Sequence, residues 1–194
     1  MNTMLQWARY SLVLATAVLP LAGCGSELAV SPEDSAAIAA TAPVAAARTV
    51  DLGACGYLAA PQGSTLAFHA YAKGAQVYRW NGQTWVFSGP DATLYADAAG
   101  TGVVGSHYRG PTWEAQGGGF VVAAVSKSCP VASADVPWLL LGVVRDEGPG
   151  VFSGVTHIQR VNTAGGRAPA GSGSYPGEVR NVPYTAEYFF YRAP

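Results

Sequence analysis

The sequence predicts an all-β fold, a single mainly antiparallel domain with the form of a β-sandwich or a barrel. From Thr49 onward, short runs of β-branched and aromatic residues alternate with clusters of Gly, Pro, Asn and Asp. These clusters recur about every 8–12 residues, which is typical of sandwiches and barrels. No window of about 11 residues in that part of the chain has a convincing helical period of apolar residues.

Eight segments are the candidate strands, because each is short, apolar or aromatic and bounded by turn residues. In chain order they are Leu66–Tyr71, Gln76–Trp80, Gln83–Ser88, Gly102–Tyr108, Gly119–Val125, Trp138–Arg145, Phe152–Val161 and Tyr184–Tyr191.

One hairpin is expected in detail at Asn81-Gly82, since this pair is the strongest signal for a two-residue type I′ turn. Such a turn pairs Trp80 with Gln83 and Tyr78 with Trp85. The two-residue period then puts Tyr78, Trp80, Trp85 and Phe87 on one face, with Val77, Arg79, Thr84 and Val86 opposite. We interpret the aromatic face as core, and a platform for stacking sugars is the functional alternative.

Composition excludes two classes of protein. Among 194 residues, Lys and Arg number 11 and Asp and Glu 12, and charged residues make up 12% of the chain. A chain so poor in charge has neither the basic face of a nucleic-acid-binding protein nor the composition of a charge-rich disordered one.

The N-terminus has the features of a lipoprotein signal peptide over residues 1–23. Arg9 is followed by an apolar stretch from Ser11 to Ala22, too short to span a bilayer as a helix but suited to a signal peptide. It ends in Leu21-Ala22-Gly23-Cys24, which resembles the bacterial lipobox. Cys24 is therefore the expected lipidation site, and an ordinary secretory signal is the alternative.

A lipid on Cys24 implies a membrane partner and a place in the bacterial cell envelope. No Asp follows Cys24, and by resemblance to enterobacterial sorting this favours the outer membrane. Residues 24–48 are rich in Ala, Pro and Ser and are expected to be a tether. The all-β domain is then expected to occupy residues 49–194.

Two cysteines remain besides Cys24. In an oxidising compartment Cys55 and Cys129 are expected to form a disulfide, and metal ligation by the two thiols is the weaker alternative. Their separation would close a large loop in the unfolded chain.

Five segments form a recognisable set in order along the chain. They are Gly74-Ala75-Gln76-Val77-Tyr78, Gly105-Ser106-His107-Tyr108-Arg109-Gly110-Pro111-Thr112-Trp113-Glu114, Val136-Pro137-Trp138-Leu139-Leu140-Leu141, Ile158-Gln159-Arg160-Val161-Asn162-Thr163-Ala164-Gly165-Gly166 and Val182-Pro183-Tyr184-Thr185-Ala186-Glu187-Tyr188. Over about Thr49 to Tyr191 the chain thus resembles the secreted bacterial and fungal family known as domain of unknown function 3455. The resemblance implies an extracytoplasmic setting and brings no established activity.

The chain departs from that family at two places. Members commonly carry one cysteine after the segment matched by Gln76–Tyr78 and another after a Gly-Gly-Lys-x-Pro loop. Here these places hold Trp80 and Gly171-Ser172-Gly173. Both cysteines are absent together, as expected if they pair in relatives, and we interpret Cys55–Cys129 as a replacement.

Some fungal relatives carry a malate-dehydrogenase-like label, and Gly100–Gly105 matches the GxGxxG pattern of dinucleotide sites. That pattern needs a following helix, which Ser106–Pro111 cannot open. The match is interpreted as accidental, and no cofactor is expected.

Standard nucleophile and metal motifs are absent from the sequence. His107 and Glu114 flank a Gly-Pro turn, and a His–Glu pair can act as an acid–base couple. A metal site from His107, Glu114 and His157 is a further alternative. The structural interpretation is that His107 and Glu114 hold the turn by hydrogen bonds while Arg160 pairs with a carboxylate such as Glu187. His69 is expected to be structural.

A ligand site is expected where the segments His107–Glu114 and His157–Thr163 converge, because polar groups in an apolar chain must meet one another, water or a ligand. Its candidate residues are His107, Trp113, Glu114, His157, Gln159, Arg160, Asn162, Thr163 and Tyr184, with Trp113 and Tyr184 as the walls. Arg160, Asn162, Thr163, Gly165 and Gly166 could bind an anion, or the glycines could only form a tight turn.

Three functions compete. The favoured one is a non-enzymatic module that binds a small molecule or a polysaccharide. The alternatives are a small hydrolase or isomerase built on His107 and Glu114, and a structural envelope protein without a ligand.

Overall fold

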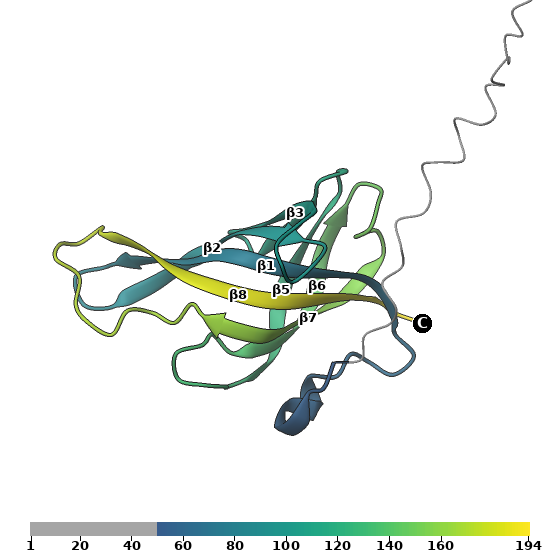
Figure 1. Ribbon diagram of the computed structural model, residues 1–194, viewed down its shortest axis with the longest axis horizontal. Coiled ribbons are helices and arrows are strands. Elements are labelled where there is room, and N and C mark those ends of the chain that lie inside the picture. The colour runs from purple at the N-terminus through teal and green to yellow at the C-terminus, as the bar shows by residue number, and fades with distance from the viewer. Residues whose placement is uncertain (1–49) are drawn as a thin grey trace, which may run out of the picture. The chain divides into compact units, whose positions relative to one another are not determined.

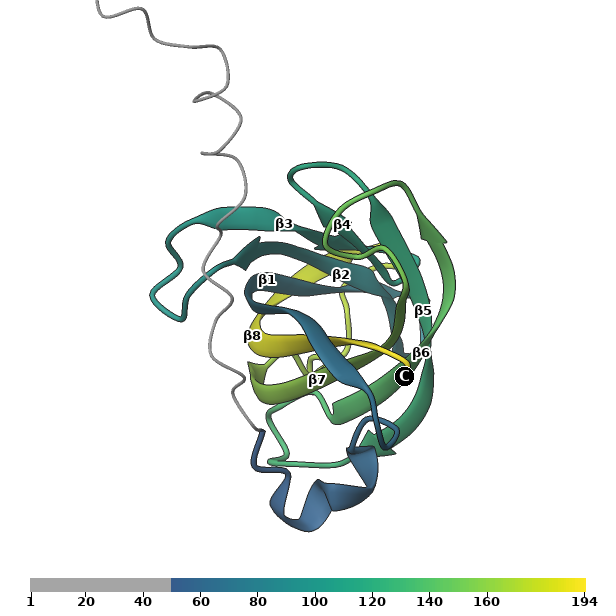
Figure 2. The ribbon, with the colours of Figure 1, turned by 90° about the vertical axis from the view of Figure 1, so that its right-hand side faces the viewer.

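The computed structural model describes residues 50–194, which form one antiparallel sheet closed into a barrel with the strands in chain order (Figures 1 and 2). The strands are β1 (Thr65–Trp80), β2 (Trp85–Tyr95), β3 (Val103–Tyr108), β4 (Thr112–Ala115), β5 (Phe120–Cys129), β6 (Trp138–Glu147), β7 (Val155–Gly165) and β8 (Val179–Arg192). The all-β, antiparallel prediction is confirmed. The predicted signal peptide, the lipidation of Cys24 and the tether lie outside the described residues.

Pairing of the first strand with the last closes the barrel. β1 and β8 are antiparallel from Thr65 opposite Arg192 to Arg79 opposite Val179. Closure leaves no unpaired sheet edge, and this is the physical difference between a barrel and an open sandwich.

β1 is one continuous strand where the sequence indicated two. Its middle holds Gly74, and a Cβ atom there would lie 2.2 Å from the Asp91 carbonyl oxygen of β2. Glycine therefore marks a close approach of two backbones rather than the end of a strand. The short strand β4 was not anticipated, because its four residues follow directly on the Gly110-Pro111 turn.

The hairpin between β1 and β2 is longer than predicted. Trp80 pairs with Trp85, so four residues form the loop. The Asn81 side-chain oxygen accepts hydrogen bonds from the backbone amides of Gln83 and Thr84, and the only positive φ in the loop is at Gly82. An Asx turn thus replaces the type I′ turn.

The aromatic face of this hairpin is as predicted despite the changed register. The ring centroids of Tyr78 and Phe87 lie 5.6 Å apart, and those of Trp80 and Trp85 lie 5.4 Å apart. Tyr78 and Trp80 are buried while half of Phe87 is exposed. This face is therefore core at one side and open at the other.

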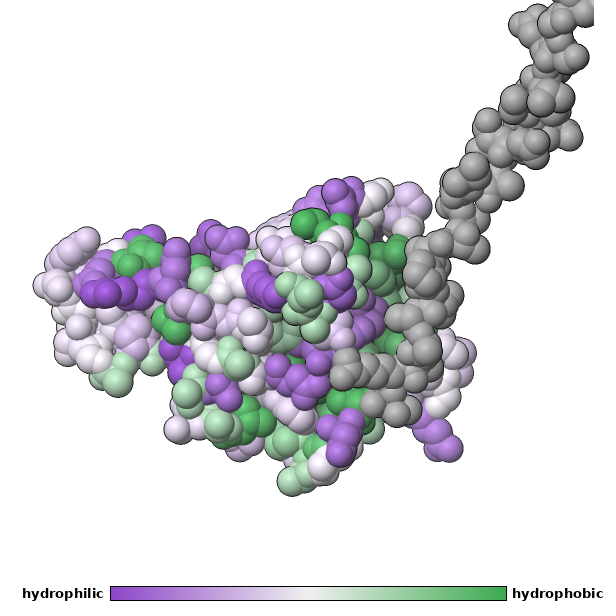
Figure 3. All heavy atoms as spheres, viewed as in Figure 1, coloured by the Kyte–Doolittle hydropathy of each residue, from purple (hydrophilic) through white to green (hydrophobic). Residues whose placement is uncertain are grey.

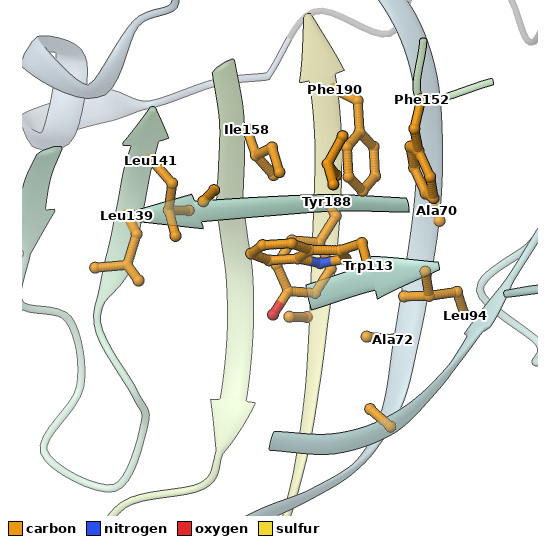
Figure 4. Close-up of a cluster of buried hydrophobic side chains, with 14 of the residues drawn as sticks. Ala70, Ala72, Leu94, Trp113, Leu139, Leu141, Phe152, Ile158, Tyr188 and Phe190 are labelled. Carbon is orange, nitrogen blue, oxygen red and sulfur yellow. The ribbon is translucent and has the colours of Figure 1, made fainter. Parts of the chain in front are cut away.

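The barrel interior is filled by alternating small and large side chains. Alanines 70, 72, 92, 115, 123 and 186 share the core with Trp113, Phe152, Tyr188 and Phe190. Figure 4 shows Trp113 over Tyr188 near the middle, with Leu139 and Leu141 to one side and Ala70 and Leu94 to the other. Small residues make room for the central rings within a narrow barrel.

A second, smaller cluster covers the outside of the barrel. The 3-10 helix η1 (Gly53–Leu58) brings Cys55 and Leu58 against Leu140. The predicted disulfide Cys55–Cys129 is confirmed, with the Cα atoms 5.8 Å apart. Within residues 50–194 there is no helix of sufficient length and apolarity to traverse a bilayer.

Candidate functional site

A cavity of about 80 Å³ is lined by residues near the β1–β2 hairpin, among them Gln76, Phe87 and Pro90. Every strand contributes to it. Its wall consists of Gln76, Phe87, Pro90, His107, Pro111, Trp113, Val125, Leu139, Leu141, Arg160 and Tyr188. On the face shown in Figure 3, apolar residues appear in several separate places among polar ones. The cavity is distinguished by the polar groups beneath its apolar rim.

His107 and Trp113 form a stacked pair in the wall. They are direct partners on β3 and β4, and their ring centroids lie 4.1 Å apart with an angle of 12° between the planes. The edge of Tyr188 meets both rings, at centroid distances of 5.1 and 5.4 Å. Packing against Trp113 and Tyr188 fixes the orientation of the imidazole.

His107 is neutral at physiological pH. Its buried Nδ1 lies 2.8 Å from the Thr112 carbonyl oxygen, and a carbonyl only accepts, so Nδ1 carries the proton. Burial lowers the pKa of His107 to about 3, and the nearby charge of Arg160 lowers it further while the bond to Thr112 opposes the shift. Nε2 is then a hydrogen-bond acceptor and a very weak base.

Arg160 carries the positive charge of the site. Its Nε and Nη2 donate to the Pro137 carbonyl oxygen, at 3.2 and 2.8 Å. No carboxylate of residues 50–194 forms an ion pair with it. The predicted pairing with Glu187 is wrong, because Glu187 contacts His69 and Asn162 instead.

Unpartnered polar atoms gather around this charge. Among the described residues, five buried side-chain atoms have no hydrogen-bond partner, and Gln76 Nε2, Trp113 Nε1 and the Tyr188 hydroxyl belong to the cavity wall. A fourth is the hydroxyl of Tyr184. Burial raises the pKa of Tyr188 and of Tyr184, while the charge of Arg160 lowers both. Weaker hydrogen-bonding contacts of Tyr188 with Arg160 and Tyr184, and of Tyr184 with Gln76, also affect these pKa values, so the groups lie close together. Leaving such atoms unpaired costs about 1–3 kcal/mol each unless water or a ligand meets them.

The predicted couple of His107 and Glu114 does not form. Because successive side chains alternate across a strand, Trp113 points into the barrel and Glu114 points out. The exposed Glu114 carboxylate accepts a hydrogen bond of 2.8 Å from the Tyr108 hydroxyl. His107 and Glu114 thus lie on opposite faces of the sheet, and the alternative metal site with His157 does not assemble.

His157 and Gln159 also face away from the cavity. Gln159 is buried under η1, where its Nε2 donates to the Leu58 carbonyl oxygen at 2.7 Å. His157 Nδ1 lies 3.0 Å from the Thr156 hydroxyl. Both sit on the outer face of β7, whereas Ile158 and Arg160 share the inner face. His69, expected to be structural, stacks on Phe189 at 4.1 Å.

The polar segment after Arg160 has partners within the protein. Thr163 donates to the Val136 carbonyl oxygen at 2.7 Å. The Gly165 amide donates to the Asp135 carboxylate at 2.6 Å, so a protein carboxylate already occupies the expected anion position. Gly165 and Gly166 have φ of 73° and 83°, which a tight turn requires. Of the five residues proposed for an anion, Arg160 is in the cavity wall.

The structure thus brings His107, Trp113 and Arg160 together in the cavity wall, and it leaves the other six predicted site residues outside that wall. Tyr184, expected as a wall, lies buried beside Tyr188 and Gln76. Sequence reasoning missed Gln76, although its place two residues before Tyr78 on the inward face of a strand was a usable signal.

A family model described as "Protein of unknown function (DUF3455)" matches residues 61–192, which include all eight strands of the barrel. The chain belongs to the DUF3455 family. No curated protein and no solved structure matches it. Within the DUF3455 match lie all the residues that form the cavity wall.

Proposed function

We propose that this DUF3455 protein is a lipid-anchored, extracytoplasmic protein of the bacterial envelope that binds a small ligand at the mouth of its barrel without transforming it. Eight-stranded barrels enclose just enough space for side chains or for one small ligand. The N-terminal lipobox-like segment ending at Cys24 supports the anchor.

The observation that carries the proposal is the position of the unpartnered polar atoms. Three of them belong to the wall of a cavity that every strand lines, together with the cationic Arg160. A purely structural protein gains nothing from burying such groups without partners, since each weakens the fold. In a binding site such groups are useful, because the ligand supplies the missing hydrogen-bond partners.

The size of the cavity favours a small molecule over a polysaccharide. About 80 Å³ is roughly half of the 150 Å³ or so in which an engineered protein cavity holds benzene. A sugar chain cannot pass through such a space.

The chemistry of the wall favours binding over catalysis. A histidine with a pKa of about 3 is a poor general base near neutral pH. Its expected partner Glu114 is on the outer face of β4. This leaves the hydrolase or isomerase alternative without its acid–base pair.

The proposal can be tested by blocking the entrance of the cavity. Val125 is exposed and lines the cavity, so Val125→Trp places a large ring over the entrance. Saturation-transfer NMR on the full-length protein with butanoate, butanamide, imidazole and glucose as probes measures binding. We expect at least one probe to bind the wild type saturably and to lose at least tenfold in affinity with Val125→Trp.

The matched control is Val144→Trp, since Val144 is also an exposed valine, in β6 and outside the cavity wall. It should bind as the wild type does. Absence of saturable binding by all four probes, or equal binding by both tryptophan variants, contradicts the proposal.

A further inference from the structure

The hydrogen-bonding capacity of the cavity is strongly biased towards donors. Trp113 offers an indole N–H without a partner, and the buried Gln76 amide, which has no partner at strict hydrogen-bond distance, lies close enough to the Tyr184 hydroxyl to lower its pKa. Arg160 uses its Nε and Nη2 side for Pro137, and hydrogen bonding to Arg160 also lowers the pKa of Tyr188, so its further N–H groups are shared between this hydroxyl and a ligand. The remaining edge of a guanidinium is the fork that fits two oxygens of a planar anion.

Protein carboxylates do not compensate these donors. Within residues 50–194, Glu178 pairs with Arg180, Asp135 accepts from the Gly165 amide, and Glu114 accepts from Tyr108 on the outer face. The charge of Arg160 lowers the pKa values of His107, Tyr184 and Tyr188. Among the described residues, the one charged side chain in the cavity wall therefore has no carboxylate partner.

The rim above the donors is apolar. The wall residues Phe87, Pro90, Pro111, Val125 and Leu139 carry no charge, and the exposed Phe87 and Val125 mark the opening. Phe87 and Val125 remain about half exposed, so their surface is available to a ligand that protrudes from the cavity. The rim therefore suits the hydrocarbon part of a ligand whose polar end lies deeper.

We infer that the cavity binds a small monocarboxylate, with the carboxylate against Arg160, Gln76 and Trp113 and a short apolar tail against the rim. This inference rests on the proposed function and names the class of its ligand. A space of about 80 Å³ holds the carboxylate and its first carbons, and the rest of the tail leaves through the mouth. One arginine balances one negative charge, whereas a multiply charged phosphate would carry excess charge into apolar walls.

The neutral His107 has a place in this arrangement. Its Nε2 is an acceptor and repels a carboxylate oxygen, so the anion must lie on the side of Arg160 and Gln76. A hydroxyl group next to the carboxylate could donate to Nε2. Lactate is therefore expected to bind at least as tightly as propanoate.

The experiment measures butanoate binding to the full-length protein by calorimetry at pH 7, with butanamide and inorganic phosphate as comparison probes. Butanoate should bind at least tenfold more tightly than butanamide, and phosphate should not compete with it. Affinity should rise from acetate through propanoate to butanoate, by roughly two- to fourfold per methylene.

Substitutions in the cavity wall separate an effect of the Arg160 charge on binding from an effect on folding. Arg160→Gln should lower the affinity for butanoate at least tenfold. Arg160→Lys should have an affinity between those of the wild type and Arg160→Gln, because lysine keeps the positive charge but cannot donate two parallel hydrogen bonds. Gln76→Glu places a carboxylate beside Arg160 and should also abolish butanoate binding while the protein stays folded. Arg145→Gln is the control, since Arg145 is an exposed arginine of β6 outside the cavity wall.

The outcomes distinguish the inference from the proposed function. If butanamide or imidazole binds and butanoate does not, and Val125→Trp abolishes that binding, the carboxylate inference is wrong and the proposed binding function stands. Phosphate competing as well as butanoate, or wild-type affinity of both Arg160→Gln and Gln76→Glu, also overturns it. Absence of binding by every probe defeats the proposed function itself.

Discussion

At the scale of single residues, burial decides the chemistry of this protein. His107 is a histidine in a turn-rich polar segment of the sequence, yet its ring is sealed between Trp113 and Tyr188. Desolvation disfavours the imidazolium form in such surroundings. The same residue type on the outer face, His69, meets a carboxylate instead. Environment, rather than identity, separates their roles.

The acid sensitivity of the fold is expected to depend on His107. The unfolded chain takes up this proton near pH 6.5, whereas the folded protein does so only near pH 3. Because the unfolded state binds more protons between these values, stability is lost as pH falls from about 6.5 towards 3. From pH 7 to pH 4 the loss due to His107 should be roughly 3 kcal/mol.

Urea unfolding at pH 7 and pH 4 measures this loss. His107→Phe keeps a ring against Trp113 and removes the titrating group, so most of that pH dependence should vanish. His157→Gln, on the outer face of β7, is the control and should keep it. An unchanged pH dependence in His107→Phe would contradict the assignment.

At the scale of elements, the two-residue alternation of the strands decides which predicted site residues face the barrel interior and which face outwards. It places Trp113 inside with Glu114 outside, and Arg160 inside with Gln159 under η1. A polar segment in the sequence is thus divided between two faces that cannot cooperate. The hairpin shows the same principle, since a register change of two residues kept all four aromatics on one face.

The close approach of β1 and β2 can be tested at Gly74. A Cβ atom there would lie 2.2 Å from the Asp91 carbonyl oxygen and 2.4 Å from the Ala92 Cα, and both are backbone atoms. Gly74→Ala must force the strands apart and should cost about 3 kcal/mol or more of unfolding free energy. Chemical denaturation measures it.

Gly142→Ala is the matched control, because a Cβ atom at Gly142 in β6 meets nothing within 4 Å. It should leave stability unchanged or raise it by up to about 1 kcal/mol. Equal effects of the two substitutions would show that strand contact is not what requires glycine at position 74.

At the scale of the whole molecule, closure of the sheet creates the site. β1 and β8 are the ends of the domain in sequence, and their pairing completes the ring around Tyr188 and Gln76. The cavity wall therefore draws on residues 76 to 188. The chain before the barrel, with Cys24, is expected to hold this site at a membrane surface.

The lipid anchor can be tested in the producing cell. Cys24→Ala removes the thiol that would carry the diacylglyceryl group, so labelling by a fatty-acid probe should be lost and an unprocessed or soluble form should appear. Cell fractionation and gel mobility measure both. Cys129→Ser, which leaves Cys24 intact, should still be labelled. Labelling that persists in Cys24→Ala would refute the lipobox.

The sequence by itself determined the antiparallel all-β class, the disulfide partners and the family, because these depend on local periodicity, cysteine count and contiguous motifs. It also identified His107, Trp113 and Arg160 as notable polar or aromatic positions. Only the tertiary structure decided that the sheet closes, and which residues then face the same cavity. Closure depends on β1 meeting β8 across most of the domain, and no local pattern encodes such a long-range pairing. Arg160, Gln76 and Trp113 line one cavity because three strands far apart in sequence turn their inner faces towards it.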